Sequence, residues 1–379
     1  MRIAIVNGAV VTAGGVLPAA TIDIAGGRIA AIETAAAGDA DAHLDLDGGW
    51  LVPGFVDAQV NGGGGVLFND RPSVEGMVAI AEAHRAFGTT ALAPTLVSET
   101  VEVIAEALDS LDSAIEQGAE GIVGVHVEGP MLNPARNGTH DRDRLRPIGP
   151  DLAEVLTKRR RGRVMVTLAP EMVSPADIAG LVAAGVIVSA GHSEADAATV
   201  RAALDAGMTG VTHLFNAMPP LRQREPGVVG VTLDDPRPWS GLIVDGVHVA
   251  PEVLRLARKA RPLDRLMLVT DAMSSVGAAE KNFTLHGQPI EVRDGICRNP
   301  DGTLAGSDLD MASAFANACA MMRVSPPEAA AMAATNPAAF LGLGATHGSI
   351  ALGARADWVV LDAALGLRET WLAGRRVAP

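Results

Sequence analysis

Two histidines in one stretch of the chain have the positions expected of a pair of metal ligands. Residues 186–220 read as a short apolar run ending at His192, a helix, and a second apolar run ending at His213. Parallel strands joined by a helix can be neighbours about 5 Å apart, which would bring both imidazoles to one edge of a sheet. For either histidine alone an ordinary polar strand end is the better interpretation. Together they indicate a metal site.

A third candidate ligand is Glu128, which follows another apolar run in the stretch HVEGP. A buried carboxylate is costly unless it is paired or bound to metal. Glu128, His192 and His213 form a two-histidine, one-carboxylate set that leaves a position for water, as in catalytic Zn²⁺ sites. The same set suits Fe²⁺. The alternative is a purely structural pairing, but the complete ligand set favours one divalent metal ion per subunit, most simply Zn²⁺.

Asp271, in LVTDAMSSVG, is the candidate proton carrier. A carboxylate facing the metal can take a proton from water whose pKa the metal lowers toward about 7, and can later pass it to a leaving nitrogen. The alternative is a helix N-cap, where aspartate is common. His126 precedes Glu128 by two residues on the same strand face, and we expect it to support or pack beneath the ligands.

These side chains require a framework of eight strands. Ala-rich helical segments separate several apolar runs, and such βα repeats favour a closed (β/α)₈ TIM-like barrel over an open doubly wound sheet. No glycine-rich phosphate loop opens the first helix, which counts against dinucleotide binding. The expected strands are residues 54–60, 90–96, 122–128, 164–169, 186–192, 210–215, 241–248 and 265–271, and the clearest helices are 74–87, 100–117, 195–206 and 251–260.

Six ligand-type or proton-carrying side chains end six of these strands. A barrel of this kind places its active site at the carboxyl ends of its strands. Ordinary solvated strand ends would show a mixture of Ser, Thr, Asn and Lys. The six residues are Gln59, Glu128, His192, His213, His248 and Asp271.

The two ends of the chain have a different pattern. Residues 2–11, 20–25 and 28–34 are β-prone runs separated by glycine pairs, and residues 348–362 and 367–377 again read as strand and turn. Three short strands cannot bury a core alone. We therefore expect one small β-sandwich domain built from residues 1–52 and 346–379, with the barrel as residues 53–345. Two independent flaps are the alternative.

Composition excludes several classes of protein. The net charge of −14 argues against nucleic acid or an anionic membrane as partner, and any anionic substrate needs a local positive pocket. Cys297 and Cys319 form no CxxC motif, which fits a reducing compartment. The start of the chain reads as a strand, so we expect neither a signal peptide nor a membrane span, and a cytoplasmic location.

Seven segments together resemble N-acetylglucosamine-6-phosphate deacetylases of the amidohydrolase superfamily, over nearly the whole chain. The combination of HLFNAM with TDAM is the most specific part. The segments are PGFVDAQVNGGGG (53–65), HVEGPMLNPARNGTHD (126–141), SAGHSEAD (189–196), THLFNAMPPLRQREPG (212–227), DGVHV (245–249), VTDAMSSVG (269–277) and GTLAGSDLDM (302–311).

The resemblance implies a role for each matching residue. Glu128, His192 and His213 match the metal ligands, and Asp271 the catalytic carboxylate. His140 matches a substrate contact, and in the expected mechanism it helps the metal to stabilise the oxyanion. The resemblance also implies a homodimer or larger oligomer, because Arg224 matches a phosphate-binding arginine that reaches the neighbouring subunit's site. Further substrate contacts are implied for Thr139, Asn216, Ala217, His248 and the segment Leu304, Ala305 and Gly306.

One departure from the wider superfamily concerns the metal count. Many members carry His-x-His on the first strand, where this chain has Gln59 and Asn61. Neither amide is a good transition-metal ligand, so we expect a single metal ion, with Gln59 as a substrate or supporting contact. The expected reaction is metal-assisted hydrolysis of the acetamido group of a phosphorylated amino sugar. Two alternatives remain: an amidohydrolase for a cyclic amide or N-acetyl amino acid, and a non-catalytic sugar-phosphate-binding protein.

Overall fold

The barrel predicted from the eight apolar runs is present. In the computed structural model, which describes residues 1–377, eight parallel strands form one sheet in the order β17-β16-β15-β14-β13-β12-β11-β8. A parallel bridge between Val60 and Ala272 brings the two edge strands together, so the sheet is nearly closed. The strands are β8 (Phe55–Val60), β11 (Thr89–Val97), β12 (Gly124–Glu128), β13 (Arg163–Leu168), β14 (Ile187–Ala190), β15 (Gly210–Val211), β16 (Trp239–Leu242) and β17 (Leu266–Leu268).

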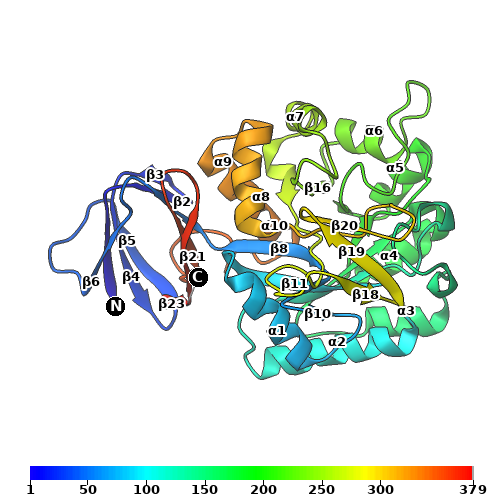
Figure 1. The fold of residues 1–379 in the computed structure, drawn as a ribbon, viewed down its shortest axis with the longest axis horizontal. Helices are drawn as coiled ribbons and strands as arrows, with labels where there is room; N and C mark the ends of the chain where they lie inside the picture. Colours follow the sequence, from blue (N-terminus) through cyan, green and yellow to red (C-terminus); the bar gives the residue numbers. More distant parts are fainter. Residues whose placement is uncertain (378–379) are drawn as a thin grey trace.

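Helices cover the outside of the barrel (Figure 1). They form where apolar residues recur on one face and a cap is available: the Ser73 side chain accepts a hydrogen bond from Gly76 N–H at the start of α1, and Thr100 caps α2 in the same way. The helices are α1 (Val74–Arg85), α2 (Val101–Glu116), α3 (Pro150–Thr157), α4 (Pro175–Ala183), α5 (Ala197–Asp205), α6 (Gly227–Asp234), α7 (Pro251–Ala260), α8 (Met311–Asn317), α9 (Pro326–Ala330) and α10 (Asn336–Phe340).

Six of the eight predicted barrel strands are shorter than expected, and one of these six, the seventh strand, was also placed wrongly. The chain leaves the sheet through residues with positive φ: His192 at 50°, His213 at 32° and Asp271 at 52°. The seventh strand was predicted over residues 241–248 but is Trp239–Leu242. His248 therefore lies in a loop that turns at Gly246 (φ 75°), and not at a strand end.

The terminal segments form two packed sheets beside the barrel (Figure 1). One sheet has the order β5-β4-β1-β6, and the other, β23-β22-β21-β7-β2-β3, combines strands from both ends of the chain. The strands are β1 (Arg2–Val6), β2 (Ala9–Thr12), β3 (Gly15–Leu17), β4 (Ala20–Ala25), β5 (Arg28–Glu33), β6 (Ala42–Asp45), β7 (Trp50–Pro53), β21 (Trp358–Leu361), β22 (Leu367–Leu372) and β23 (Arg375–Val377).

A shared apolar core joins the two terminal sheets. Ile3, Ile22 and Val10 from the amino-terminal strands pack in one cluster with Trp358 and Val360 from the carboxy-terminal ones. The predicted fold class, a TIM-like barrel with a small β-sandwich, is thus confirmed. We propose 1–52 with 346–379 as the bounds of the small domain and 53–345 as those of the barrel, residues 378–379 lying outside the described part.

Three features were not predicted. The run expected as one strand over residues 2–11 breaks at Asn7, whose φ is 56°, and gives β1 and β2 in different sheets. A three-stranded sheet, β18 (Phe283–Leu285), β19 (Gln288–Arg293) and β20 (Ile296–Arg298), is inserted after β17. It packs through Leu285, Ile290 and Cys297 against Leu67 and Met273, so it covers one side of the barrel mouth. Two two-residue strands, β9 (Gly62–Gly63) and β10 (Val66–Leu67), pair beneath it.

Candidate active site

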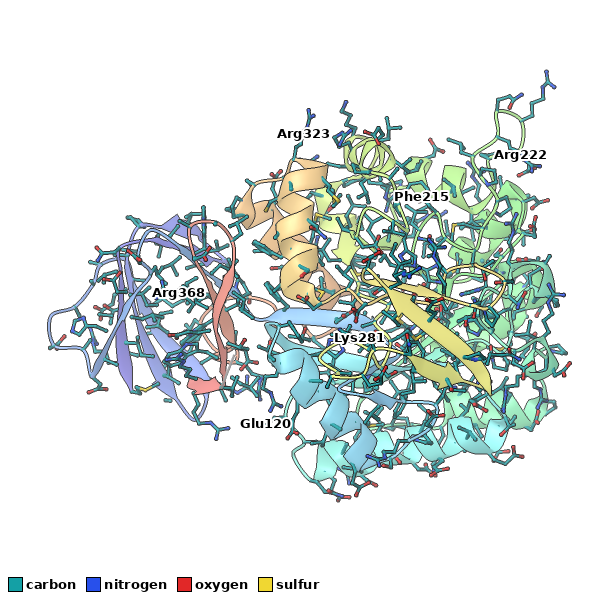
Figure 2. All side chains as sticks on the ribbon, in the orientation of Figure 1. Glu120, Phe215, Arg222, Lys281, Arg323 and Arg368 are labelled. Atoms are coloured by element: carbon teal, nitrogen blue, oxygen red, sulfur yellow. The ribbon has the colours of Figure 1, made fainter. Side chains whose placement is uncertain are left out.

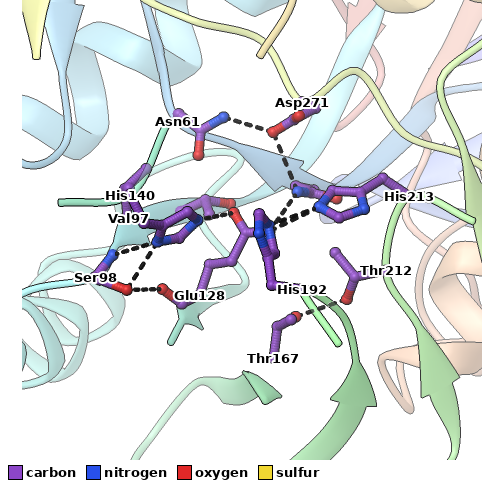
Figure 3. A network of polar contacts seen from close by, with 12 residues as sticks. Asn61, Val97, Ser98, Glu128, His140, Thr167, His192, Thr212, His213 and Asp271 are labelled. Atoms are coloured by element: carbon purple, nitrogen blue, oxygen red, sulfur yellow. Dashed lines mark hydrogen bonds and ion pairs between the residues drawn. The ribbon is translucent and has the colours of Figure 1, made fainter. Parts of the chain in front are cut away.

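The predicted ligand atoms converge at the carboxyl ends of β12, β14 and β15 (Figure 3). Oε1 of Glu128 lies 3.2 Å from Nε2 of His192 and 3.1 Å from Nε2 of His213, and the two imidazole nitrogens are 3.0 Å apart. Ligand atoms about 2.0–2.1 Å from a tetrahedral ion lie about 3.3 Å from one another. The three atoms therefore have the spacing of one face of a metal coordination sphere.

The hydrogen bonds behind these atoms support a cation at their centre. Nδ1 of His192 lies 2.8 Å from the carbonyl oxygen of Arg136, so Nδ1 carries the proton of the neutral ring and Nε2 has a free lone pair. That lone pair faces a carboxylate oxygen and another imidazole nitrogen. Nδ1 of His213 has no hydrogen-bond partner among the described residues. A divalent ion removes the repulsion between these acceptors, so the residues present fit a metal.

Charge couples the three groups strongly. Burial raises the pKa of Glu128, but in the metal-free chain the adjacent Nε2 atoms of His192 and His213, when they carry protons, outweigh burial and hold that pKa well below its usual range. Burial lowers the pKa of His213, yet the hydrogen bond and charge of Glu128 leave it raised. Glu128 is thus an anion at neutral pH, as a metal ligand must be.

His140 stands beside this centre with its proton directed toward the cavity. Nδ1 of His140 accepts a hydrogen bond from Ser98 N–H (3.2 Å) and lies 2.7 Å from Ser98 Oγ. The proton of the neutral ring is therefore on Nε2, which is 3.9 Å from Oε2 of Glu128. Burial, with the nearby charge of His192, places the pKa of His140 well below its usual range. His140 is a neutral hydrogen-bond donor.

A second triplet, Glu128, His140 and His192, also brings one ligand atom from each residue within 4.8 Å of the others. The triplet with His213 is tighter, at 3.0–3.2 Å. Since Nε2 of the neutral His140 bears a proton, it cannot also offer a lone pair to a metal. We favour the set with His213 as the ligands.

Asp271 lies at the same mouth, and two amides hold it. Nδ2 of Asn61 donates a hydrogen bond of 2.7 Å to Oδ1 of Asp271, and Nε2 of Gln59 donates one of 3.1 Å to the same oxygen. Gln59 also donates to Oε1 of Glu128 at 3.2 Å. Burial and the charge of Glu128 raise the pKa of Asp271 to about 6. Because this pKa is close to neutral pH, Asp271 can both accept and return a proton there.

Most of the other predicted contacts line one cavity of about 460 Å³ at this mouth. His248 presents its ring there while Nδ1 bonds Oδ2 of Asp245 at 2.6 Å. The hydroxyl of Thr139 donates to Oδ1 of Asn299 in the inserted segment, 3.1 Å away. The predicted residues around the cavity are Glu128, Thr139, His140, His192, His213, Asn216, Ala217, His248, Asp271, Leu304 and Gly306.

Three predicted contacts do not line the cavity. Gln59 is buried beneath it between two carboxylates. Ala305 is fully buried in the apolar cluster under the inserted sheet and is not among the residues that line the cavity. Arg224 is exposed in the segment between Ala217 and α6. The neighbouring Arg222 marks how far this loop projects from the barrel (Figure 2). Within one chain the structure does not bring Arg224 to the site.

Sequence reasoning missed several residues of the site. Ser98, an ordinary small residue after β11, fixes the tautomer of His140, and nothing in its sequence context signals this. Arg136 lines the cavity and lies in the quoted segment NPARNGTHD. Asn61 was noted only for lacking an imidazole, yet it makes the shortest bond to Asp271. His126 meets its expectation: both ring nitrogens bond threonines, Thr95 at 3.2 Å and Thr167 at 2.7 Å.

No helix of the described residues is long and apolar enough to cross a membrane.

Comparison with known proteins identifies the family of the chain. The Amidohydrolase family profile matches residues 50–376. An N-acetylgalactosamine-6-phosphate deacetylase of Shewanella sp. (strain ANA-3) is 40% identical over 369 residues, covering 96% of this chain and 93% of the relative. An N-acetylglucosamine-6-phosphate deacetylase of Bos taurus is 37% identical, covering 89% and 86%.

The similarity extends to three dimensions. The crystal structure of N-acetylglucosamine-6-phosphate deacetylase from Pasteurella multocida superposes with a TM-score of 0.95 at 32% identity and covers both chains completely. The barrel and the terminal sheets are thus shared. The chain belongs to the amidohydrolase family and, within it, to the group of N-acetylhexosamine-6-phosphate deacetylases.

Proposed function

We propose that this chain hydrolyses the acetamido group of N-acetyl-D-glucosamine 6-phosphate to D-glucosamine 6-phosphate and acetate, in amino-sugar metabolism. The observation that supports the proposal is the convergence of Oε1 of Glu128 and Nε2 of His192 and His213 within 3.2 Å of one another. Asp271, a carboxylate with a pKa raised to about 6, lies beside them. A sugar-phosphate-binding protein has no need of such a centre. The close relatives with named deacetylase activity support the same reaction.

We assign Glu128, His192 and His213 as ligands of one divalent ion, with Zn²⁺ preferred and Fe²⁺ as the alternative. When bound, such an ion lowers the pKa of water toward about 7 and polarises a carbonyl group. The chain's own contribution begins with orientation. Arg136 O fixes the ring of His192, and Gln59 holds Glu128 and Asp271 at a set separation.

Asp271 then acts as general base and later as general acid. Its Oδ1 is held by two amides, which leaves Oδ2 to take a proton from the attacking water. The tetrahedral intermediate places negative charge on the former acetyl oxygen, and Nε2–H of His140 is a neutral donor for that charge. Transfer of the proton from Asp271 to the departing nitrogen releases the amine, and the carboxylate is regenerated.

The remaining cavity residues would hold the sugar phosphate. We assign Asn216, Ala217 and His248 to the sugar phosphate, and Thr139 with Leu304 and Gly306 to the acetamido end. Arg224, exposed and outside the cavity of its own chain, is proposed to bind phosphate in the site of a neighbouring subunit. That role requires at least a homodimer. A forked guanidinium suits a phosphate monoester.

A second candidate substrate is N-acetyl-D-galactosamine 6-phosphate, because the 40% identical relative carries that name. The two sugars differ only in the configuration at C4, far from the acetamido group. A substrate panel decides between them: initial rates of acetate release from both phosphates, with dihydroorotate, hydantoin and N-acetyl amino acids beside them. Turnover of a cyclic amide or an N-acetyl amino acid above both sugar phosphates would contradict the proposal.

A further inference from the structure

The backbone carbonyl of Arg136 orients His192, whereas its charged side chain takes no part in that contact. Arg136 ends the short 3₁₀ helix Pro134–Arg136, in the loop that follows β12, and it lines the catalytic cavity. Among the described residues around that cavity it is the only arginine or lysine, while Glu128 and Asp271 contribute negative charge. Among the described residues of one chain, Arg136 therefore supplies the permanent positive charge at the cavity.

The backbone of Arg136 is held independently of its side chain. Its N–H donates to the carbonyl oxygen of Asn133 at 2.8 Å, and its own carbonyl oxygen accepts from Nδ1 of His192 at 2.8 Å. Substitution of the side chain leaves both backbone bonds available. The charged group can thus be changed without removing the bond that orients the metal ligand.

The guanidinium is only partly used. Its Nε forms an ion pair with Oε1 of Glu194, and the structure gives no further hydrogen bond to its two terminal nitrogens. A guanidinium has five N–H donors, so four remain for another acceptor. The side chains of both partners are about one-third exposed, 32% for Arg136 and 39% for Glu194. Such a pair is weak and open to competition from a doubly charged anion.

Electrostatics favours an anion at this point. A phosphate monoester carries about 1.5 to 2 negative charges at pH 7, and it must enter a protein whose net charge is −14. Bidentate contact with a planar guanidinium is among the strong, charge-assisted hydrogen-bonded pairings for phosphate. We propose that Arg136 binds the substrate's phosphate from within the same chain, and that Glu194 competes with the phosphate for it. This inference rests on the proposed phosphorylated substrate and adds a residue to its recognition.

The alternative is that the Arg136–Glu194 pair only holds the loop in place. The two interpretations predict different effects of removing each charge. If Glu194 competes with phosphate, then Glu194→Gln frees Arg136 and tightens phosphate binding, whereas Arg136→Met weakens it. If the pair is structural, the two variants break the same contact and act in the same direction.

Calorimetric titration of the metal-loaded, full-length protein tests this without turnover. The ligands are glucosamine 6-phosphate and glucosamine, which differ only in the phosphate. We expect Arg136→Met to raise the Kd of glucosamine 6-phosphate by about ten- to a hundredfold and to leave the Kd of glucosamine unchanged. Arg136→Lys retains part of the affinity, and Glu194→Gln lowers the Kd of glucosamine 6-phosphate.

Equal losses on both ligands, no change in Arg136→Met, or weaker phosphate binding in Glu194→Gln would each overturn the proposal. The readout is separate from the proposed reaction. A chain that binds glucosamine 6-phosphate in this charge-dependent way but releases no acetate contradicts the deacetylase function and leaves the Arg136 assignment supported. If the wild-type chain releases acetate but the Arg136→Met variant binds glucosamine 6-phosphate with unchanged affinity, the deacetylase function is supported and the Arg136 assignment is contradicted.

Discussion

Nε2 of Gln59 donates a hydrogen bond of 3.1 Å to Oδ1 of Asp271. The same nitrogen donates to Glu128, so one amide links the carboxylate of the ligand set to the carboxylate of the proton carrier. A neutral side chain thereby occupies the place between two negative charges where a second cation would otherwise be favourable. Asn61, two residues on, donates to the same oxygen of Asp271.

The first prediction concerns pH. Asp271 must be ionised to accept a proton, and its pKa of about 6 in the metal-free chain falls when a cation binds nearby. Turnover is therefore present above this pKa and is lost as the pH falls through it, with the midpoint at or below about pH 6. The pH profile of kcat/KM checks this. An acid limb well above pH 6 would contradict it.

Asn61→Ala should move that limb to higher pH. The hydrogen bond from Nδ2 of Asn61 lowers the pKa of Asp271, so its loss raises that pKa and protonates the base sooner. Asn299→Ala is the matched control, because that amide bonds Thr139 and not Asp271. A limb that shifts equally in both variants would show that Asn61 does not act through Asp271.

Asp271→Asn should retain metal and lose most turnover. The amide has nearly the same shape but cannot accept the proton, and general-base catalysis typically contributes about 10²–10⁴-fold. Metal content per chain and kcat are measured on the same sample. Retention of a near wild-type rate would exclude Asp271 as the base.

The metal should stabilise the fold and bind once per chain. Without it, lone pairs and a carboxylate face one another at 3.0–3.2 Å. At a free metal concentration 100 times Kd, linkage adds about 2.7 kcal/mol to the free energy of unfolding, visible as a rise in Tm. His213→Ala should abolish this rise.

The amides at the first strand should set the metal count. We expect one ion per wild-type chain, and a second to bind in the double variant Gln59→His, Asn61→His, because imidazoles replace poor ligands. Elemental analysis of both proteins provides the comparison. Two ions per wild-type chain would refute the single-site assignment.

Arg224 should act in the neighbouring subunit. Asp271→Asn and Arg224→Ala are each expected to be poorly active on the phosphorylated substrate. In a mixed oligomer one site combines an intact Asp271 with an intact Arg224 from the other chain, so mixing after subunit exchange should restore activity. Absence of any recovery, despite demonstrated exchange, would place Arg224 outside the site.

Gly49→Ala tests the domain built from both termini. A Cβ at position 49 would lie 2.1 Å from the carbonyl oxygen of Leu361, across the contact between the two ends of the chain. We expect a loss of about 1–3 kcal/mol in unfolding free energy. Gly38→Ala, where a Cβ has open space, is the control. Unaltered stability in Gly49→Ala would contradict the shared domain.

The barrel could be predicted from the sequence because its strands are buried on both sides and form continuous apolar runs between amphipathic helices. The metal ligands could also be predicted, because Glu128, His192 and His213 each end such a run. The exact strand ends could not be predicted, since they depend on positive φ at His192, His213 and Asp271, and residues of these types adopt it only where surrounding contacts impose it.

The inserted sheet of β18–β20 and the role of Ser98 were also beyond sequence reasoning. The insertion covers the mouth through contacts of Leu285 and Cys297 with residues more than a hundred positions away, such as Leu67. Ser98 acts by bonding Nδ1 of His140 across 42 positions. Local patterns do not report on partners at such separations. His248 was placed correctly at the cavity but on the wrong element, because its strand ends six residues earlier.

The most direct measurement is acetate release from N-acetylglucosamine 6-phosphate by one preparation in three states: as purified, stripped of metal by a chelator, and reconstituted with Zn²⁺. We predict turnover in the first, loss of at least about a hundredfold in the second, and recovery that saturates at one equivalent of metal per chain in the third. Undiminished acetate release by the stripped protein, or none in any state, would contradict the proposed function.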